Sequence, residues 1–303
     1  MSQQKHRILL TGASSGLLWR LVALIDPDKY VIRAVSRTPQ KKTLSHCDWW
    51  IGDIADTGFI RKAVAGVDSV IHGAAVTHGT RGEYRKVNVN GSKLLVDEAI
   101  RARVGRFIFI SSRVAGELSG AYGKSKWTAE QYIKEQFQDW LILRPAEIYG
   151  GKNEEGIDRF IRRVAASSVI LCPTGIKSPL RPLHIDDAAQ LIHTAIFRNT
   201  GENRIIYING NSEYSLLSLA KTVTSISGGK PLILPVPSWL LIPFGQLLEK
   251  IPFNMGFAPD QVTRLYSRKK HDDVSGYNFK SLHEYIEELV KKAARRTDNR
   301  YRL

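Results

Sequence analysis

The first 150 residues alternate short runs of β-branched and aromatic residues with longer segments of helical periodicity. The runs that we expect to be strands are Arg7–Leu10, Tyr30–Val35, Asp48–Ile51, Ser69–His72, Phe107–Ser111 and Trp140–Arg144. The helices that we expect between them are Leu17–Ile25, Gly58–Ala65, Asn90–Arg103 and Lys124–Gln138. This alternation is typical of βαβ units, whose strands form one parallel sheet. We therefore expect an α/β fold, a Rossmann-type doubly wound core with six parallel strands.

Proline and glycine interrupt the chain more often after Gly151, which favours a lobe of short helices and loops. A helix over Ile185–Phe197 and a seventh strand over Ile205–Asn209 are expected within this half, so the chain returns to the first core. We predict a dinucleotide-binding core formed by residues 1–150, to which the chain returns at about residues 183–210. Residues 151–182 and 211–303 are predicted to form a smaller C-terminal substrate lobe, which closes a cleft over the carboxyl ends of the strands.

The composition supports a folded core and suggests an anionic partner. The 303 residues include 43% hydrophobic residues, close to the average for globular proteins. The formal net charge of +15 favours nucleic acid, an acidic membrane surface or a phosphorylated substrate. Five of these charges come from the last thirteen residues, which we interpret as a solvated helix end. Cys47 and Cys172 are too few for a disulfide framework or a zinc site, and we expect both to be buried, reduced thiols.

We expect neither an N-terminal signal peptide nor a membrane-spanning segment. The N-terminus enters the first expected strand at Arg7, which leaves no room for a signal peptide, so we expect a cytoplasmic protein. The most apolar later stretch, residues 239–248, is too short to cross a bilayer. Residues 239–257 could instead line an apolar pocket or contact a membrane peripherally.

A glycine-containing turn joins the first expected strand to the first expected helix. Its sequence is Thr11-Gly-Ala-Ser-Ser-Gly16, and this strand, turn and helix order is what makes the motif informative. Gly12 allows a tight turn, and Gly16 lets the backbone approach a pyrophosphate at the helix N-terminus. The third glycine of such motifs is absent, because its place falls on Leu18 or Trp19.

The end of the second expected strand indicates which dinucleotide is preferred. Sites for NAD carry an acid about twenty residues beyond the glycines, but this chain has Ser36 and Arg37 there. A guanidinium and a hydroxyl can hold a ribose 2′-phosphate, so NADP(H) is favoured over NAD(H). Asp53 follows the third strand, where a carboxylate can meet the adenine edge.

A phenol and an ammonium lie four residues apart in Tyr122-Gly-Lys-Ser-Lys126, on one face of an expected helix. A phenol with a pKa near ~10 is a poor base at neutral pH, and a nearby cation lowers that pKa. The strand that ends in Ser111 and Ser112 lies ten residues upstream, so its hydroxyls are expected beside the phenol.

Together these motifs resemble the extended branch of the short-chain dehydrogenase/reductase superfamily, the NAD-dependent epimerase/dehydratase family, over about residues 5–211. Further segments carry the resemblance, in family order: Gly52-Asp53, Val70-Ile-His-Gly-Ala-Ala75, Asn88-Val-Asn-Gly-Ser92, Leu143-Arg-Pro-Ala-Glu-Ile-Tyr-Gly150 and Arg181-Pro-Leu-His-Ile-Asp-Asp187. The family mostly acts on nucleotide sugars. The resemblance therefore implies a substrate that is a UDP-sugar or a dTDP-sugar.

The resemblance also implies a role for individual residues. Tyr122 would be the acid/base at the sugar, Lys126 would bind the nicotinamide ribose, and Ser112 would hydrogen-bond the reacting oxygen. Because the loop before Tyr122 is short, Ser111 could take the serine role instead. The cofactor contacts implied are Gly12, Ser14, Ser15, Gly16, Leu17, Ser36, Arg37, Asp53, Ile54, Gly73, Ala74, Ala75, Tyr122, Lys126, Pro145 and Ile148. The substrate contacts implied are Ser111, Glu147 and Arg181, the last of these to the diphosphate.

The activity expected is an NAD(P)-dependent epimerase or 4-ketoreductase that transfers a hydride to or from a sugar carbon. Arg113 and Val114 stand where a dehydratase has an Asp-Glu pair, which argues against dehydration. Two other functions stay open. One is an NADPH-dependent reductase of a non-sugar ketone, and the other is a cofactor-bound regulatory or nucleic-acid-binding protein without turnover. No metal site is expected at His184-Ile-Asp-Asp187, no nucleic acid is expected as a partner, and a homodimer would be compatible with the sequence.

Overall fold

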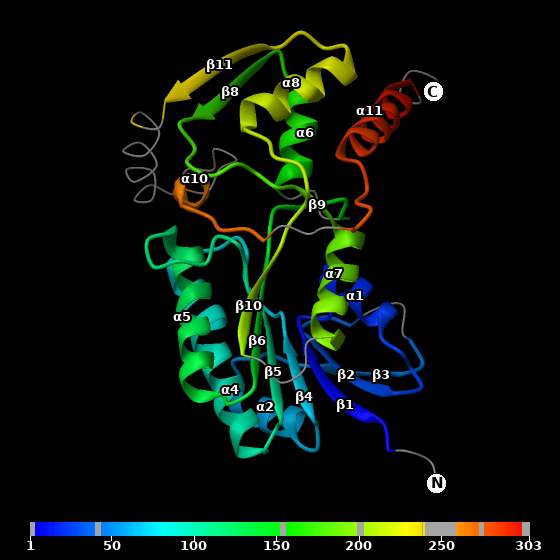
Figure 1. The fold of residues 1–303 in the computed structure, drawn as a ribbon, viewed down its shortest axis with the longest axis vertical. Helices are drawn as coiled ribbons and strands as arrows, with labels where there is room; N and C mark the ends of the chain where they lie inside the picture. Colours follow the sequence, from blue (N-terminus) through cyan, green and yellow to red (C-terminus); the bar gives the residue numbers. More distant parts are fainter. Residues whose placement is uncertain are drawn as a thin grey trace. The chain divides into compact units, whose positions relative to one another are not determined.

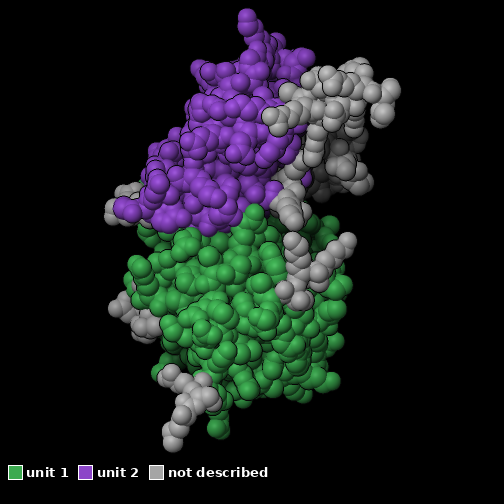
Figure 2. Space-filling view, turned by 90° about the vertical axis from the view of Figure 1, so that its right-hand side faces the viewer, with its two compact units in different colours: residues 1–145, 188–208, 270–272 green, residues 146–187, 209–269, 273–303 purple. Residues whose placement is uncertain are grey.

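The computed structural model describes residues 4–39, 44–151, 156–198, 203–237, 239, 259–272 and 276–298. The chain packs as two compact units, coloured separately in Figure 2. The first contains residues 1–145, 188–208 and 270–272, and the second contains residues 146–187, 209–269 and 273–303. The second unit therefore begins at Ala146, inside the segment that the sequence pattern places in the core.

The first unit is built on a seven-stranded sheet in which every pairing is parallel. Its spatial order is β10-β6-β5-β4-β1-β2-β3. The strands are β1 (His6–Thr11), β2 (Tyr30–Ser36), β3 (Cys47–Ile51), β4 (Ser69–His72), β5 (Arg106–Ile110), β6 (Trp140–Pro145) and β10 (Arg204–Ile208). All seven expected strands are confirmed, with ends that differ by one residue at most. The order reverses between β1 and β4, which is where parallel open sheets bind their ligands.

Helices cover both faces of this sheet (Figure 1), so the doubly wound α/β prediction is confirmed. One face packs against α2 (Thr57–Val64), α4 (Ser92–Arg101) and α5 (Gly120–Gln136). Their apolar side chains, with alternate residues of the strands, form one core cluster. On the other face lie α1 (Gly16–Leu24) and α7 (Ile185–Arg198), where the ring of Phe197 contacts that of Tyr30 in β2.

The helix expected at Asn90–Arg103 begins earlier in the structure. A short helix α3 (Arg81–Glu83) leads into eight residues of π-helix, Tyr84–Gly91, and only then into α4. Thr80 and Glu83 form a reciprocal capping box at the start of α3. The residues within 84–91 are mostly polar and include a glycine, so apolar periodicity does not predict this turn, and π-helix is rare.

The second unit contains strands that the sequence pattern did not predict. A parallel pair joins β8 (Val169–Thr174) to β11 (Leu232–Pro237), and β7 (Ile148–Tyr149) pairs with β9 (Leu183–His184). The expectation of helices and loops alone was wrong here, because the prolines that suggested loops lie within or next to two-stranded sheets, where a missing N–H is tolerated.

The helices of the second unit are α6 (Ile157–Ala166), α8 (Leu216–Ser227), α10 (Pro259–Tyr266) and α11 (Leu282–Asp298). A separate apolar cluster lies among α6, α8, α11 and the inner face of β8. Cys172 is buried in it, as expected, whereas Cys47 in β3 is only half-buried. Within the described residues, no helix is both long and apolar enough to cross a membrane.

Candidate dinucleotide-binding and catalytic site

The turn after β1 has a backbone that only glycine suits. Gly12 has a φ of +78°, and a Cβ placed on it would lie 2.6 Å from the backbone nitrogen of Ala74. The next helix, α1, is capped by Ser15, whose hydroxyl accepts a hydrogen bond from Leu18 N. Its N-terminus at Gly16 therefore begins beside an exposed turn and carries the positive end of the helix dipole. This cradle fits a pyrophosphate.

The missing third glycine is compensated on a neighbouring strand. Leu18 is 2% exposed, and its Cδ1 lies 2.4 Å from where a Cβ of Gly73 would be. Gly73 follows β4 and donates a hydrogen bond to Thr11 O at 3.1 Å. The space that glycine usually provides on the helix is thus provided on the adjacent strand end. Trp19 points elsewhere, with its ring 5.8 Å from that of Trp49.

The residues expected near the ribose and adenine lie at the ends of β2 and β3. Gly52 N donates to Ser36 O at 3.0 Å, which brings the two strand ends together. Arg37 is exposed, whereas the Ser36 hydroxyl is buried and donates to Thr38 O. Asp53 accepts a hydrogen bond from Ala55 N at 2.9 Å, so its carboxylate is held in a fixed turn.

The predicted acid/base pair lies near the start of α5. Tyr122 is 8% exposed and packs edge-to-face on Tyr84, with 5.8 Å between the ring centroids. One turn further, Lys126 is 2% exposed and donates to Ile110 O at 2.8 Å, with its Nζ 4.2 Å above the Phe109 ring. Burial lowers the pKa of Lys126 to about 7, against the opposing effect of a nearby carboxylate, Glu130.

The two serines at the end of β5 have different surroundings. Ser111 is buried, and its hydroxyl donates to Glu130, which is completely buried on α5. Glu130 also accepts from Arg144 Nε at 2.9 Å, and Arg144 donates to the Tyr207 hydroxyl at 3.0 Å. Ser112 is half-buried, and its hydroxyl accepts from Val114 N at 3.4 Å. The structure therefore places Ser111 in a packed polar network.

Sequence reasoning missed the buried ion pair between Glu130 and Arg144. The available signal was spacing, since Glu130 follows Lys126 by four residues and so lies on the same face of α5. Arg144 lies in β6, inside an apolar run that we treated only as a strand. A buried charge needs a partner, and these two residues provide one for each other.

A second buried network connects β1, β4 and α4. Ser92 donates to Asn88 O at 2.7 Å, so the proton on the 2.8 Å contact between Ser92 Oγ and His72 Nε2 belongs to the imidazole. His72 Nδ1 then accepts from the Thr11 hydroxyl at 2.7 Å. Burial, with a smaller effect from the Lys126 charge, lowers the pKa of His72 to about 3. His72 is therefore neutral and holds the two strands that flank the turn.

Asn88 fixes the start of α5 from the π-helix. Its side chain accepts from Val76 N at 2.8 Å and donates to Ser125 Oγ at 3.0 Å. Ser125 in turn donates to the Tyr122 carbonyl at 2.7 Å. The backbone that carries the phenol is thereby connected to the loop after β4.

Comparison with known proteins is decisive for the family. The model of the NAD(P)H-binding family matches residues 12–164, about half of the chain. The chain belongs to the NAD(P)H-binding family. Its fold is that of the extended short-chain dehydrogenase/reductases, as the sequence resemblance implied.

Individual relatives of this NAD(P)H-binding protein are distant. It is 26% identical over 220 residues to the rat mitochondrial NADH dehydrogenase [ubiquinone] 1 alpha subcomplex subunit 9, covering 71% of this chain and 57% of the relative. It is 27% identical over 272 residues to UDP-glucose 4-epimerase of Vibrio cholerae, covering 80% and 82%. A solved structure of MoeE5 with UDP-glucose and NAD superposes with a TM-score of 0.68 at 19% identity, covering 96% and 99%. The chain spans 57–59% of the length of the first curated relatives it matches.

Two residues expected at the substrate belong to the second unit of this NAD(P)H-binding protein. Arg181 donates from Nε and Nη2 to one carboxylate oxygen of Glu213, at 3.0 and 2.6 Å. Glu147 accepts from Arg181 N at 3.2 Å and from Lys269 Nζ at 3.0 Å. The guanidinium that we expect to bind a diphosphate is thus held by an intramolecular carboxylate. Two other expected contacts lie nearby in the sequence, Pro145 at the end of β6 and Ile148 in β7.

The two aspartates after His184, Asp186 and Asp187, bind other residues of the second unit. Asp187 accepts from the Tyr277 hydroxyl at 3.1 Å and from Lys280 N at 2.8 Å, and Asp186 pairs with Lys280 Nζ at 2.6 Å. In the described part of the chain, no three His, Cys, Asp or Glu side chains are grouped as metal ligands.

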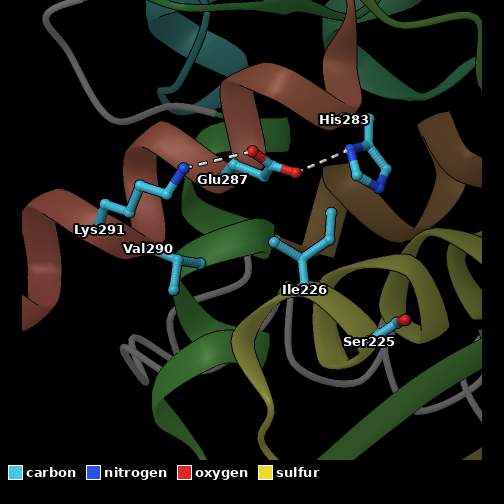
Figure 3. A pocket seen from close by; sticks show the side chains of 6 residues that line it. All are labelled: Ser225, Ile226, His283, Glu287, Val290 and Lys291. Atoms are coloured by element: carbon cyan, nitrogen blue, oxygen red, sulfur yellow. Dashed lines mark hydrogen bonds and ion pairs between the residues drawn. The ribbon is translucent and has the colours of Figure 1, made fainter.

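A pocket also lies between α8 and α11, distant in sequence from the motifs above. Its walls are Ser225, Ile226, His283, Glu287, Val290 and Lys291. Figure 3 shows Glu287 between His283 and Lys291, which lie 3.4 Å from it on either side. These charges pair along one helix face at spacings of four residues, as on an ordinary solvated surface, and we assign no ligand to this pocket.

Proposed function

We propose that this protein is an NAD(P)-dependent enzyme that transfers a hydride between the nicotinamide and a carbon of a nucleotide-diphosphate sugar. The observation that carries the proposal is the environment of Lys126. This lysine is fully buried on α5, one helical turn from Tyr122. Its Nζ reaches Ile110 O at the end of β5, the strand that leads to Ser112. Burying a charge in this way lowers stability, and such sites are typically functional.

The side chains can then be given roles. Tyr122 takes or gives the proton of the reacting hydroxyl or carbonyl, and the Lys126 ammonium stabilises the phenolate form. The Ser112 hydroxyl hydrogen-bonds the reacting oxygen, since Ser111 is used by Glu130. When bound, NAD(P) supplies the hydride donor or acceptor. The Vibrio cholerae relative is a UDP-glucose 4-epimerase, and the MoeE5 structure contains UDP-glucose. Both support a UDP-sugar or dTDP-sugar as the substrate. The reaction proposed is epimerisation or 4-ketoreduction.

The test of this proposal is Tyr122→Phe, which removes only the hydroxyl. We expect NADPH binding to persist while turnover of the sugar falls about a hundredfold or more, the scale for losing a positioned acid or base. Lys126→Ala should weaken both. Full activity of Tyr122→Phe on the true substrate would remove the tyrosine from the mechanism.

The cofactor is proposed to be NADP(H) in preference to NAD(H), because the exposed Arg37 follows β2 where an acid would favour NAD. NADPH should bind more tightly than NADH by about 1–2 kcal/mol, as expected for a charge-assisted contact. Arg37→Asp should reverse the order in a fluorescence titration. Equal affinities in the unmodified protein would exclude Arg37 as the determinant.

One observation favours a second candidate. The fork of Arg181 already holds the Glu213 carboxylate, so a substrate without a diphosphate would leave this pair intact. An NADPH-dependent reductase of a non-sugar ketone is the function that fits this arrangement.

A further inference from the structure

The second unit presents an apolar sheet surface that the proposed chemistry does not use. The outward side chains of β8 are Val169 and Leu171, which are 51% and 65% exposed. Those of β11 are Leu232 and Leu234, which are 58% and 40% exposed. The register pairs Leu232 with Val169 and Leu234 with Leu171, so the four side chains form one contiguous square. We name these four residues the aliphatic strand face.

The opposite side of the same two strands is packed normally. Ile170 and Cys172 are buried, and they join the cluster formed with α6 and α8. Figure 1 shows these helices beside the β8–β11 pair. The aliphatic strand face is therefore the outer surface of a two-stranded sheet whose inner surface is already satisfied.

Exposed apolar residues are concentrated here and scattered elsewhere. Among the described residues, five of the ten large apolar side chains that are exposed are the aliphatic strand face and Trp239, which is 70% exposed and lies two residues beyond β11. The other five are distributed one each over α1, β2, β3, α4 and the loop before α5. Single exposed apolar residues are normal, but a contiguous group indicates an interaction surface.

The two sequence segments that contain these strands carry charge of one sign. Residues 167–177 and 229–248 contain no Asp or Glu, and the two exposed charges at the ends of the strands are Lys177 and Lys230. A combination of exposed lysines, aliphatic side chains and a tryptophan is typical of surfaces that enter the headgroup region of a membrane.

The composition argues against a protein partner. Binding energy at protein interfaces is concentrated in Trp, Tyr and Arg, whereas Leu and Val are under-represented among such residues. Four of the five exposed apolar residues of this region are Leu or Val, and only Trp239 is of an enriched type. Residues 167–177 and 229–248 also contain no acidic acceptor for a partner's arginine. We propose that the aliphatic strand face, with the exposed Trp239 two residues beyond β11, is a membrane-docking surface that partitions into the interface of an anionic bilayer.

The test is vesicle flotation of the full chain. We expect the protein to float with vesicles of equal parts phosphatidylcholine and phosphatidylglycerol, and to bind pure phosphatidylcholine vesicles less. Leu171→Glu and Leu234→Glu should each lower the partition coefficient about tenfold, because a carboxylate replaces an aliphatic group that enters the bilayer. Ile100→Glu is the matched control, since Ile100 is 42% exposed on α4, and it should float like the unmodified protein.

Two readouts keep the result independent of folding and of catalysis. Thermal unfolding and NADPH binding should be unchanged in all three variants, because the replaced side chains are exposed. The emission of Trp239, isolated as the difference from Trp239→Phe, should shift to the blue on vesicle binding. Absence of flotation with either vesicle, equal flotation of the Leu171→Glu and unmodified proteins, or a dimer that Leu171→Glu dissociates in solution would each overturn the proposal.

Discussion

Adjacent serines at the end of β5 illustrate how a single step along an extended chain changes a residue's surroundings. Successive side chains of a strand point to opposite faces, so the hydroxyl of Ser111 meets Glu130 while that of Ser112 does not. Sequence alone left both as candidates for the catalytic serine. Burial and the hydrogen bond to Glu130 favour Ser111 as a positioning residue and Ser112 as the group at the reacting oxygen.

These roles predict opposite effects for two alanine variants. Ser112→Ala should lower kcat about a hundredfold or more, the scale for losing a donor to a developing oxyanion, with little change in stability. Ser111→Ala should lower the free energy of unfolding by about 1–2 kcal/mol, because Glu130 loses a buried donor, while most activity remains. Steady-state kinetics and urea unfolding of both variants measure this. The reverse pattern would assign the catalytic role to Ser111.

The buried His72 predicts acid sensitivity. Its pKa is about 3 in the folded protein, below the ordinary value of 6.5, so between these pH values the unfolded state binds more protons. The free energy of unfolding should therefore fall as the pH drops through this window, by at most about 1.4 kcal/mol per pH unit from this group. His72→Gln should be less stable at pH near 7, through lost hydrogen bonds, but should show a shallower decline.

Urea unfolding at several pH values across that window provides the measurement. The unmodified protein is the control, since every other titrating group is shared. Parallel curves for the two proteins would mean that protonation of His72 does not contribute to acid unfolding.

At the scale of elements, the parallel sheet could be predicted because its strands are short apolar runs separated by helical segments of ordinary length. The shape of the cofactor turn could not be fully predicted. The sequence showed that a glycine was missing at Leu18, but not that Gly73, more than fifty residues later, makes room for it. That compensation exists only through contact between α1 and the end of β4.

The second unit shows the limit of local patterns more clearly. Its β8–β11 pair connects residues about sixty positions apart, and its prolines resemble loop signals. The pairing of Arg181 with Glu213 likewise cannot be predicted from the sequence, since no spacing rule relates a residue two positions before β9 to the loop before α8. The structure of each of these segments depends on a contact with a residue far away in the sequence.

The Arg181–Glu213 ion pair predicts that Glu213 lowers the affinity of Arg181 for a substrate diphosphate. A diphosphate that binds the Nε and Nη2 donors of Arg181 competes with Glu213, so Glu213→Gln should increase UDP affinity several-fold by removing the competing charge. Arg181→Ala should weaken UDP or dTDP binding by about 1.5–3 kcal/mol without altering NADPH affinity.

Calorimetric titration of both nucleotides against the three proteins tests this. Lys177→Gln, a charge change at an exposed residue of the same unit, is the control and should bind like the unmodified protein. If neither nucleotide binds any of them, the non-sugar ketone becomes the leading substrate class. If both bind and Arg181→Ala has no effect, the diphosphate lies elsewhere.

At the scale of the whole molecule, the two units carry different information. The first has the α/β fold of an NAD(P)H-binding family together with a tyrosine, a buried lysine and a serine at one sheet edge. The second has the expected substrate residues and the aliphatic strand face. The net charge of +15 suits both an anionic cofactor and an anionic substrate, and it also favours an anionic membrane surface.

The most direct test of the central proposal follows the hydride itself. The purified protein is incubated in one reaction with a 4-keto UDP-sugar or dTDP-sugar and NADPH that carries deuterium at both C4 positions of the nicotinamide, and in a second reaction with a 4-hydroxy UDP-sugar or dTDP-sugar and oxidised cofactor. The products are analysed by mass spectrometry and NMR. A reductase will place one deuterium on the sugar carbon in the first reaction, whereas an epimerase should interconvert the 4-hydroxy sugars in the second with no net change in the cofactor. The rate of either reaction should fall about a hundredfold or more in Tyr122→Phe. Absence of transfer and of epimerisation with every nucleotide sugar, in a protein that still binds NADPH, would contradict the account.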